Sequence, residues 1–235
     1  MGVIRWIAVQ VIRLGAWLFL RLEVTGMDRV PRAGAVLLVA NHISFVDPLL
    51  LYVIMPRQVT GLAKAELWGN PISRLVARAW GTIPIRRGEM DLNAMRQALS
   101  VLHGGGMMGL APEGTRSHHG RLLRARSGIV LLASRAPEAV LVPVAMYGQE
   151  RLLHNLRRLR RTQVKVVVGQ AFRLLPVPQR PTHEARQAMS DEVMLRIAAL
   201  LPPSYHGVYA GQQLVECYTM TETEDAATRA RHPCA

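Results

Sequence analysis

The chain has 235 residues, of which 50% are hydrophobic and 5% aromatic, with ordinary numbers of glycine (19) and proline (14). This composition excludes a disordered chain, a collagen-type repeat and a low-complexity polymer, and the length fits one large or two small domains. Lysines and arginines (29) outnumber aspartates and glutamates (16), and the resulting net charge of +13 indicates an anionic partner, namely nucleic acid, acidic lipid or a phosphorylated substrate.

The amino terminus carries an apolar stretch, residues 3–22, that is interrupted by Arg5, Arg13 and Arg21. An arginine at the centre of a spanning helix costs about 2.5 kcal/mol or more, and the uncharged pieces are far shorter than the roughly 18 residues of a membrane span, so no transmembrane helix is expected. No small-residue cleavage site follows, which disfavours a secretory signal. Because the arginines share one half of a helical wheel, residues 1–22 are predicted to form an amphipathic, membrane-associating helix. The alternative is an amphipathic helix packed on its own domain.

Beyond this helix, short β-branched runs alternate with longer helical runs, a pattern typical of an α/β domain. The predicted strands are residues 35–40, 58–63, 81–85, 107–111, 140–146 and 164–168. The predicted helices are residues 48–55, 66–79, 92–103, 126–135 and 183–200. Most of the strands are almost entirely apolar, which indicates a sheet covered by helices on both faces.

No internal repeat or Pro-rich linker divides the chain, so a single domain is predicted over residues 23–210. We expect an α/β fold in which a central, mostly parallel sheet is covered by helices on both faces and is preceded by the amphipathic N-terminal helix. Residues 211–235 are polar and are predicted to be a disordered tail. The densest positive cluster is interpreted either as a solvated face or as a membrane-facing patch; it comprises Arg157, Arg158, Arg160 and Arg161.

A short polar segment follows the predicted strand 35–40 and opens the next helix, which is where α/β sheets place reactive groups. It contains His42 and Asp47, which can meet if the histidine ends the strand and the helix begins between them. Two helix starts fit: Ser44 as N-cap with Asp47 as the third residue, or Asp47 as N-cap with Pro48 first. Either start puts the carboxylate in the first turn, where it could orient one nitrogen of His42 and leave the other free as a base. The alternative interpretation is a loop histidine beside an ordinary helix cap.

A second polar segment, Glu113-Gly114-Thr115-Arg116, directly follows the predicted strand 107–111. A glycine lets the backbone turn close to a ligand, and a hydroxyl and a guanidinium supply donors that suit phosphate. The alternative is a polar turn in which Glu113 pairs with Arg116.

Two further segments are less informative alone. The strand 81–85 delivers Arg86 at its carboxyl end, on the same side as the other motifs if the strands run parallel. Residues 142–144 (Val-Pro-Val) are most simply a core or edge strand.

In this order, Asn41-His42 with Asp47, Ile83-Pro-Ile-Arg86, Glu113-Gly-Thr-Arg116 and Val142-Pro-Val144, the chain resembles the glycerolipid acyltransferases typified by 1-acylglycerol-3-phosphate acyltransferase. The four blocks cover residues 35–144, and the general pattern extends to about residue 201. The resemblance implies an O-acyltransferase that moves a fatty acyl group from acyl-CoA or acyl-carrier protein to the free hydroxyl of 1-acylglycerol-3-phosphate, giving phosphatidate.

The same resemblance implies roles for individual residues. His42 is then the general base and Asp47 its orienting partner. The acceptor phosphate is implied to be held by Arg86, Glu113, Gly114, Thr115 and Arg116. Asn41 and Arg126 are implied to support the site.

Some expectations concern partners and surroundings. Since the histidines show no ligand spacing, no metal is expected, and no cofactor is needed beyond the acyl-CoA or acyl-carrier protein co-substrate. The expected partners are lysophosphatidate or a related lysolipid and an anionic membrane surface, and the expected location is the cytoplasmic face of the cell membrane, with peripheral or shallow anchoring.

The chain departs from the family pattern at two positions, and two alternative functions stay open. Family members often have an aromatic residue where Ile83 and Ala111 stand in this chain. The alternatives are the same chemistry on another lysophospholipid or lipid acceptor, and a non-catalytic basic lipid-binding module. Nucleic acid is not expected, because no zinc, RNP-like or basic-zipper pattern is present.

Overall fold

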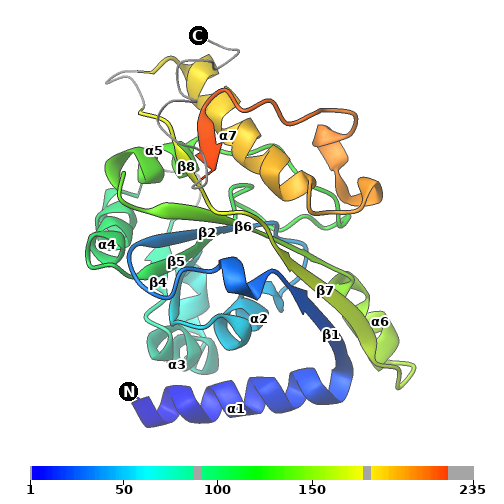
Figure 1. Ribbon diagram of the computed structural model, residues 1–235. Coiled ribbons are helices and arrows are strands. Elements are labelled where there is room, and N and C mark those ends of the chain that lie inside the picture. The colour runs from blue at the N-terminus through cyan, green and yellow to red at the C-terminus, as the bar shows by residue number, and fades with distance from the viewer. Residues whose placement is uncertain (1, 87–90, 177–180, 222–235) are drawn as a thin grey trace.

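The computed structural model describes residues 2–86, 91–176 and 181–221 (Figure 1). Its helices are α1 (Gly2–Phe19), α2 (Asp47–Ile54), α3 (Pro71–Ala79), α4 (Leu92–His103), α5 (Gly128–Arg135), α6 (Leu152–Leu156) and α7 (His183–Ala198). Its strands are β1 (Leu20–Thr25), β2 (Val36–Ala40), β3 (Val59–Lys64), β4 (Ile83–Ile85), β5 (Met107–Leu110), β6 (Val140–Tyr147), β7 (Thr162–Val168), β8 (Phe172–Leu174) and β9 (Thr219–Thr221).

The strands form one sheet in the order β1-β7-β6-β2-β5-β3-β4. From β6 to β4 all neighbours are parallel, and β1 is parallel to β7, while β7 pairs with β6 in the antiparallel sense. β8 pairs with the opposite end of β6 and carries β9 on its other edge. The prediction of a mostly parallel central sheet is therefore confirmed.

The two faces of the sheet are covered by different helices, as predicted (Figure 1). Successive side chains of a strand point to opposite faces. Leu37 and Val39 of β2 accordingly pack with α4, α5 and α7, whereas Val36 and Leu38 pack with α2. Because both faces are buried, these strands read as continuous apolar runs in the sequence.

The first helix is shorter than predicted. α1 ends at Phe19, and Leu20 already pairs with Thr162 as the first residue of β1. A pairing with such a distant partner leaves no local signal, which is why residues 20–22 were wrongly assigned to the helix. By length and composition alone α1 could cross a membrane, but a helix near the amino terminus passes the same test for other reasons.

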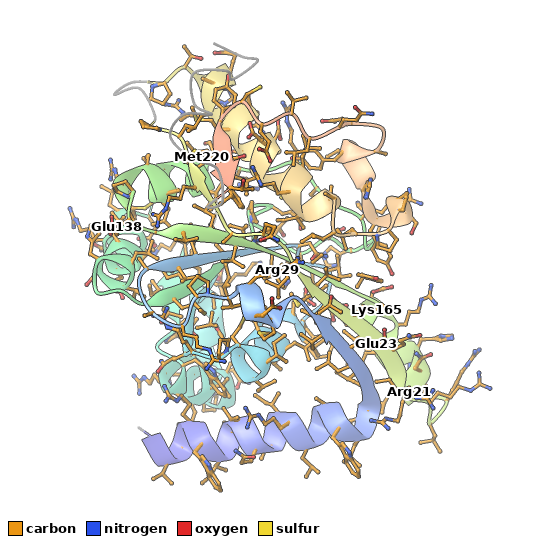
Figure 2. The ribbon with its side chains drawn as sticks, viewed as in Figure 1. Arg21, Glu23, Arg29, Glu138, Lys165 and Met220 are labelled. Carbon is orange, nitrogen blue, oxygen red and sulfur yellow. The ribbon has the colours of Figure 1, made fainter. Side chains whose placement is uncertain are left out.

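α1 lies along the edge of the domain beneath α2 and α3 (Figure 1). Arg13 Nη2 donates to the Val53 carbonyl at 3.3 Å, and Arg5 Nη1 donates to Gln58 Oε1, so arginines face the domain. None of the helix's described residues is buried, and its largest apolar side chains are exposed. Figure 2 shows side chains projecting from the helix on the side away from the domain.

The prediction of a disordered tail from residue 211 is wrong for its first part, because β9 closes onto β8. Buried Glu192 of α7 accepts the backbone N–H groups of Cys217, Tyr218 and Thr219 at 3.2, 2.8 and 2.8 Å. Arg196, one turn later on α7, donates to Thr219 Oγ1 at 2.8 Å. Residues 222–235 of the predicted tail lie outside the described residues.

Other boundaries shifted for local reasons. The predicted helix 66–79 is divided, because Pro71 begins α3 and the residue before a proline avoids helical backbone angles; Asn70 is extended at φ −91° and ψ 128°. The predicted strand 81–85 is shortened to β4 by a turn at Gly81, whose φ is +64°. The side chains of Asp91 and Thr182 cap α4 and α7 by accepting backbone N–H groups of the first turn.

Candidate active site

The predicted site residues lie where parallel strands end. His42 follows β2, Glu113 follows β5 and Arg86 follows β4. Because β2, β5 and β4 run parallel with β3 between the latter two, their carboxyl ends share one edge of the sheet. A fourth residue, Gln149, reaches the same place from the end of β6.

His42 and Asp47 form a direct side-chain pair. His42 Nδ1 lies 2.8 Å from Asp47 Oδ2, and the side chains are 21% and 3% exposed. An ionised carboxylate only accepts hydrogen bonds, so Nδ1 carries the proton and the lone pair is on Nε2. Within the described part of the chain Nε2 has no hydrogen-bond partner, and His42 lines a pocket.

The Asp47 carboxylate is held by several donors. Besides His42, Oδ2 accepts the backbone N–H groups of Ile43 and Ser44, each at 2.8 Å. Oδ1 accepts Gln149 Nε2 at 2.9 Å. These contacts compensate a buried negative charge that would otherwise be very costly.

Neither predicted helix start is correct, although the predicted place of the carboxylate is. Val46 is the N-cap residue without a side-chain cap, and Asp47 is the first residue of α2 with Pro48 next. Instead of capping the helix, Asp47 turns back to the strand–helix loop, and its bond to the Ser44 N–H holds that loop. This geometry is what brings His42 and Asp47 together.

Glu113, which the resemblance assigns to the acceptor phosphate, contacts the backbone of the site in this structure. Its side chain is buried and accepts His42 N–H at 2.9 Å and Leu123 N–H at 3.0 Å. Burial raises the pKa of Glu113 to about 7, against the effect of these donors and with a contribution from the Asp47 charge. The buried Glu113 carboxylate therefore holds the backbone of the His42 loop through a hydrogen bond. The alternative, an ion pair between Glu113 and Arg116, does not occur between these two described residues.

Asn41 also fixes the backbone at the site, by joining two neighbouring strands. Its Nδ2 donates to the Met146 carbonyl, and its Oδ1 accepts the Met146 N–H, both at 2.8 Å. The side chain is buried and joins the end of β2 to β6. Asn41, which was expected to support the site, thus contacts the Met146 backbone and holds the end of β2 against β6.

Gly114 and Thr115 line the pocket beside His42. Gly114 has φ +68°, and a Cβ there would lie 2.6 Å from Arg126 Cδ, so the Arg126 side chain lies against this turn. The Arg116 side chain is half-buried and makes no hydrogen bond or ion pair with the residues that the structure describes, and it is not among the residues that line the two neighbouring pockets.

Two pockets meet at this edge of the sheet. The smaller, of about 160 Å³, lies between His42 and the Gly114 turn and is otherwise lined mainly by apolar residues such as Leu51 and Tyr52. The larger, of about 500 Å³, shares Leu62, Ile85, Leu110, Ala111 and Gly114 with the first. Its interior is apolar, from α4 and α5, and arginines join its lining: Arg86, Arg126 and Arg186. Among the described residues no group of three or more potential metal ligands occurs.

Two residues of this site were missed in the sequence. Arg186 comes from α7, far along the chain, and Gln149 follows β6 after Gly148. A polar residue just beyond a strand end is the signal that identified His42, and the same signal could have identified Gln149. No local pattern marks Arg186.

The fold and these side chains define an α/β protein with a histidine–aspartate site at the carboxyl ends of its central parallel strands. Residues 21–147, more than half of the chain, match the family model described as Acyltransferase. The chain therefore belongs to the acyltransferase family, as the resemblance predicted.

Individual relatives agree with this family. The chain is 32% identical over 206 residues to the lyso-ornithine lipid O-acyltransferase of Pseudomonas aeruginosa, covering 79% of this chain and 78% of that protein. It is 29% identical over 140 residues to the 1-acyl-sn-glycerol-3-phosphate acyltransferase of Borreliella burgdorferi, covering 58% of this chain and only 56% of that protein. The crystal structure of the 1-acyl-sn-glycerophosphate (LPA) acyltransferase PlsC from Thermotoga maritima matches with a TM-score of 0.62 at 23% identity, over 83% of this chain and 79% of that one, and this likeness concerns the fold.

Proposed function

We propose that this protein transfers a fatty acyl group from an acyl thioester to the free hydroxyl of 1-acylglycerol-3-phosphate, with His42 as the general base. The observation that carries the proposal is the 2.8 Å bond between His42 Nδ1 and Asp47 Oδ2, which leaves Nε2 free at the pocket beside Gly114. An alcohol is a poor nucleophile at neutral pH, and a positioned base accelerates such attack typically by 10²–10⁴-fold.

The reaction proceeds by direct transfer. His42 Nε2 takes the hydroxyl proton while the oxygen attacks the thioester carbonyl, and a tetrahedral intermediate forms. Its collapse breaks the carbon–sulfur bond, and the imidazolium returns the proton to the leaving thiolate. No acyl-enzyme is needed, so the donor and the acceptor occupy the site together.

The larger pocket combines an apolar interior with cationic side chains, as a lysophospholipid acceptor requires. The larger pocket has an apolar interior that includes Ala94, Ala98 and Leu132, which suits a hydrocarbon chain. Arg86 and Arg126 at this pocket offer fork-shaped donors to a phosphate, and Gly114 lets the backbone approach it. Acyl-CoA and acyl-carrier protein both remain in the proposal as donors.

The proposal includes shallow attachment to the cytoplasmic face of the cell membrane. Trp6 and Trp17 of α1 are 63% and 68% exposed, on a helix whose Arg5 and Arg13 face the domain. Exposed tryptophans on an interfacial helix favour insertion among lipid headgroups.

The arginine cluster lies at the end of this same helix. Arg161 Nε donates to the Leu20 carbonyl at 3.1 Å, so it joins the α6–β7 turn to the α1–β1 junction. Arg157, Arg158 and Arg160 are exposed there, around Leu159, which is 95% exposed. This arrangement supports the membrane-facing interpretation of the cluster, because cations next to an apolar surface attract anionic lipid.

The test is a panel of lysolipids supplied with acyl-CoA and, separately, with acyl-carrier protein, read by mass spectrometry. We expect lysophosphatidate to be acylated, and His42→Ala to abolish turnover while the melting temperature and vesicle binding stay close to wild type. Wild-type rates in His42→Ala would refute the general base.

One observation favours a second acceptor. The Pseudomonas relative, a lyso-ornithine lipid O-acyltransferase, matches this chain over four fifths of its length. The panel therefore includes lyso-ornithine lipid, and acylation of that acceptor without acylation of lysophosphatidate would replace the proposed acceptor and remove the phosphate role of Arg86 and Arg126.

A further inference from the structure

Gln149 stands at the end of β6 with its side chain fully buried. It follows Gly148, whose φ is +96° and whose added Cβ would lie 2.3 Å from the Gln163 carbonyl oxygen. Only glycine fits such a turn, so the backbone itself directs the chain inward at this point. Gln149 then reaches Asp47 Oδ1, the carboxylate oxygen that does not contact the His42 loop.

The contacts of Asp47 are divided between its two oxygens. Oδ2 accepts His42 Nδ1, Ile43 N–H and Ser44 N–H, all at 2.8 Å. Oδ1 accepts Gln149 Nε2 at 2.9 Å, and the described residues supply it with no other donor. Gln149 is thus the side chain that fixes the rotation of the carboxylate plane and supports the charge on its second oxygen.

The oxygen of the Gln149 amide, unlike its nitrogen, makes no hydrogen bond with the described residues. Gln149 Oε1 is the one buried side-chain polar atom among the described residues that lacks a hydrogen-bond partner. The reverse orientation of the amide would place two oxygens together at Asp47, so the observed one is required. A buried acceptor without a partner is unfavourable for folding, and a buried apolar side chain of similar size would avoid it.

We propose that Gln149 is a positioning residue for the acyl transfer. It holds Asp47 Oδ2 toward His42 Nδ1, so that the other ring nitrogen, Nε2, is left for the substrate at the pocket. The inference rests on the proposed general-base role of His42 and concerns a residue outside the four motif blocks.

Two substitutions test it. Gln149→Met removes the donor at nearly constant volume, and we expect kcat to fall about 10–100-fold while the KM for the acceptor changes less than threefold. Gln149→Glu adds a titrating group next to Asp47. Because a nearby negative charge favours imidazolium, the acidic limb of the kcat/KM profile should move to higher pH by about one unit.

A matched pair of controls is available on α7. Gln187 Nε2 donates to Asp191 Oδ1 at 2.9 Å, the same type of contact away from His42. Gln187→Met and Gln187→Glu should leave the pH profile and kcat at wild-type values. Melting temperatures of all four variants separate loss of fold from loss of rate.

The outcomes are distinct. Wild-type kcat in Gln149→Met, or an unmoved pH profile in Gln149→Glu, would overturn the positioning role, provided that His42→Ala is inactive. Turnover in His42→Ala would instead overturn the proposed function. If Gln149→Met does not fold, the NMR titration of the His42 ring in Gln149→Glu decides: an imidazole pKa equal to that of wild type contradicts the proposal, and a raised one supports it.

Discussion

Asp47 is a charged side chain in the interior, and four donors converge on its two oxygens. Two of these donors are backbone N–H groups of the loop that carries His42. The carboxylate therefore shapes the loop and orients the imidazole with the same oxygen. A substitution that keeps the shape of the Asp47 side chain but removes its charge can therefore separate these two roles.

Asp47→Asn should lower kcat by at least about 100-fold with a modest change in acceptor KM. The amide keeps one acceptor oxygen but no longer stabilises the imidazolium, and its NH₂ group favours the wrong tautomer of His42. Steady-state kinetics with lysophosphatidate measure the split between kcat and KM. A defect confined to KM would contradict the orienting role.

Glu113 should impose a pH dependence on stability. Its pKa in the folded protein is raised to about 7 from 4.5, so the folded state binds the proton more tightly than the unfolded state. Its contribution is therefore fully present below about pH 4.5, declines as the pH rises and is lost above about 7, with a slope of at most about 1.4 kcal/mol per pH unit.

Urea unfolding of wild type and Glu113→Gln between pH 4 and 8 measures this effect. The difference between the two free energies of unfolding should change across the window in the direction given. A constant difference would show that Glu113 keeps an ordinary pKa.

At the scale of elements, Gly114 in the turn after β5 is restricted both by its backbone angles and by the neighbouring Arg126 side chain. Gly114 has φ +68°, and a Cβ there would meet Arg126, whereas Gly211 has φ +77° with no atom within 4 Å of such a Cβ. Both positions carry the cost of left-handed backbone for alanine, but only one also displaces a side chain.

Gly211→Ala should therefore lower stability by about 1 kcal/mol with unchanged kinetics. Gly114→Ala should lower stability by at least as much and also raise the acceptor KM, because Arg126 must move. Thermal unfolding and steady-state kinetics on both variants test this comparison. Equal kinetics in the two would remove Arg126 from acceptor binding.

Elements whose signals are local were predicted well from the sequence. The capped helix α4 has its predicted bounds, and the apolar strands β2, β5 and β6 shift by one residue at an end. The polar segments after β2 and β5 were also found, because parallel strand ends meet. The short strands β1, β8 and β9 were missed, since each exists through a partner distant in the sequence. The motif did not reveal that the Glu113 side chain is buried and accepts two backbone N–H groups.

For the whole molecule, the helix α1 and the basic α6–β7 turn lie at the same end (Figure 1), and the large apolar side chains of α1 are exposed there. Arg21 stands at this end too, and Lys165 pairs with Glu23 at 3.3 Å farther along the same two strands (Figure 2). Neither apolar burial nor charge attraction alone anchors a protein firmly to lipid, but together they do.

Replacing Trp6 and Trp17 with serine should weaken binding to vesicles that contain phosphatidylglycerol by at least about tenfold, because each indole contributes buried apolar area. Sedimentation with vesicles measures the loss. Val208→Ser, which changes an exposed apolar residue away from α1, is the control and should bind like wild type. Unchanged binding by the double variant would exclude α1 as the anchor.

The pairing of β1 with β7 and of β8 with β9 also constrains when the sheet can form during synthesis of the chain. β1 leaves the ribosome early, yet its neighbour Thr162–Val168 follows much later, and β8 gains its outer neighbour only when Thr219–Thr221 is synthesised. Contacts between such distant segments slow folding. The sheet therefore stays open at the β1 and β8 edges until most of the chain has been synthesised.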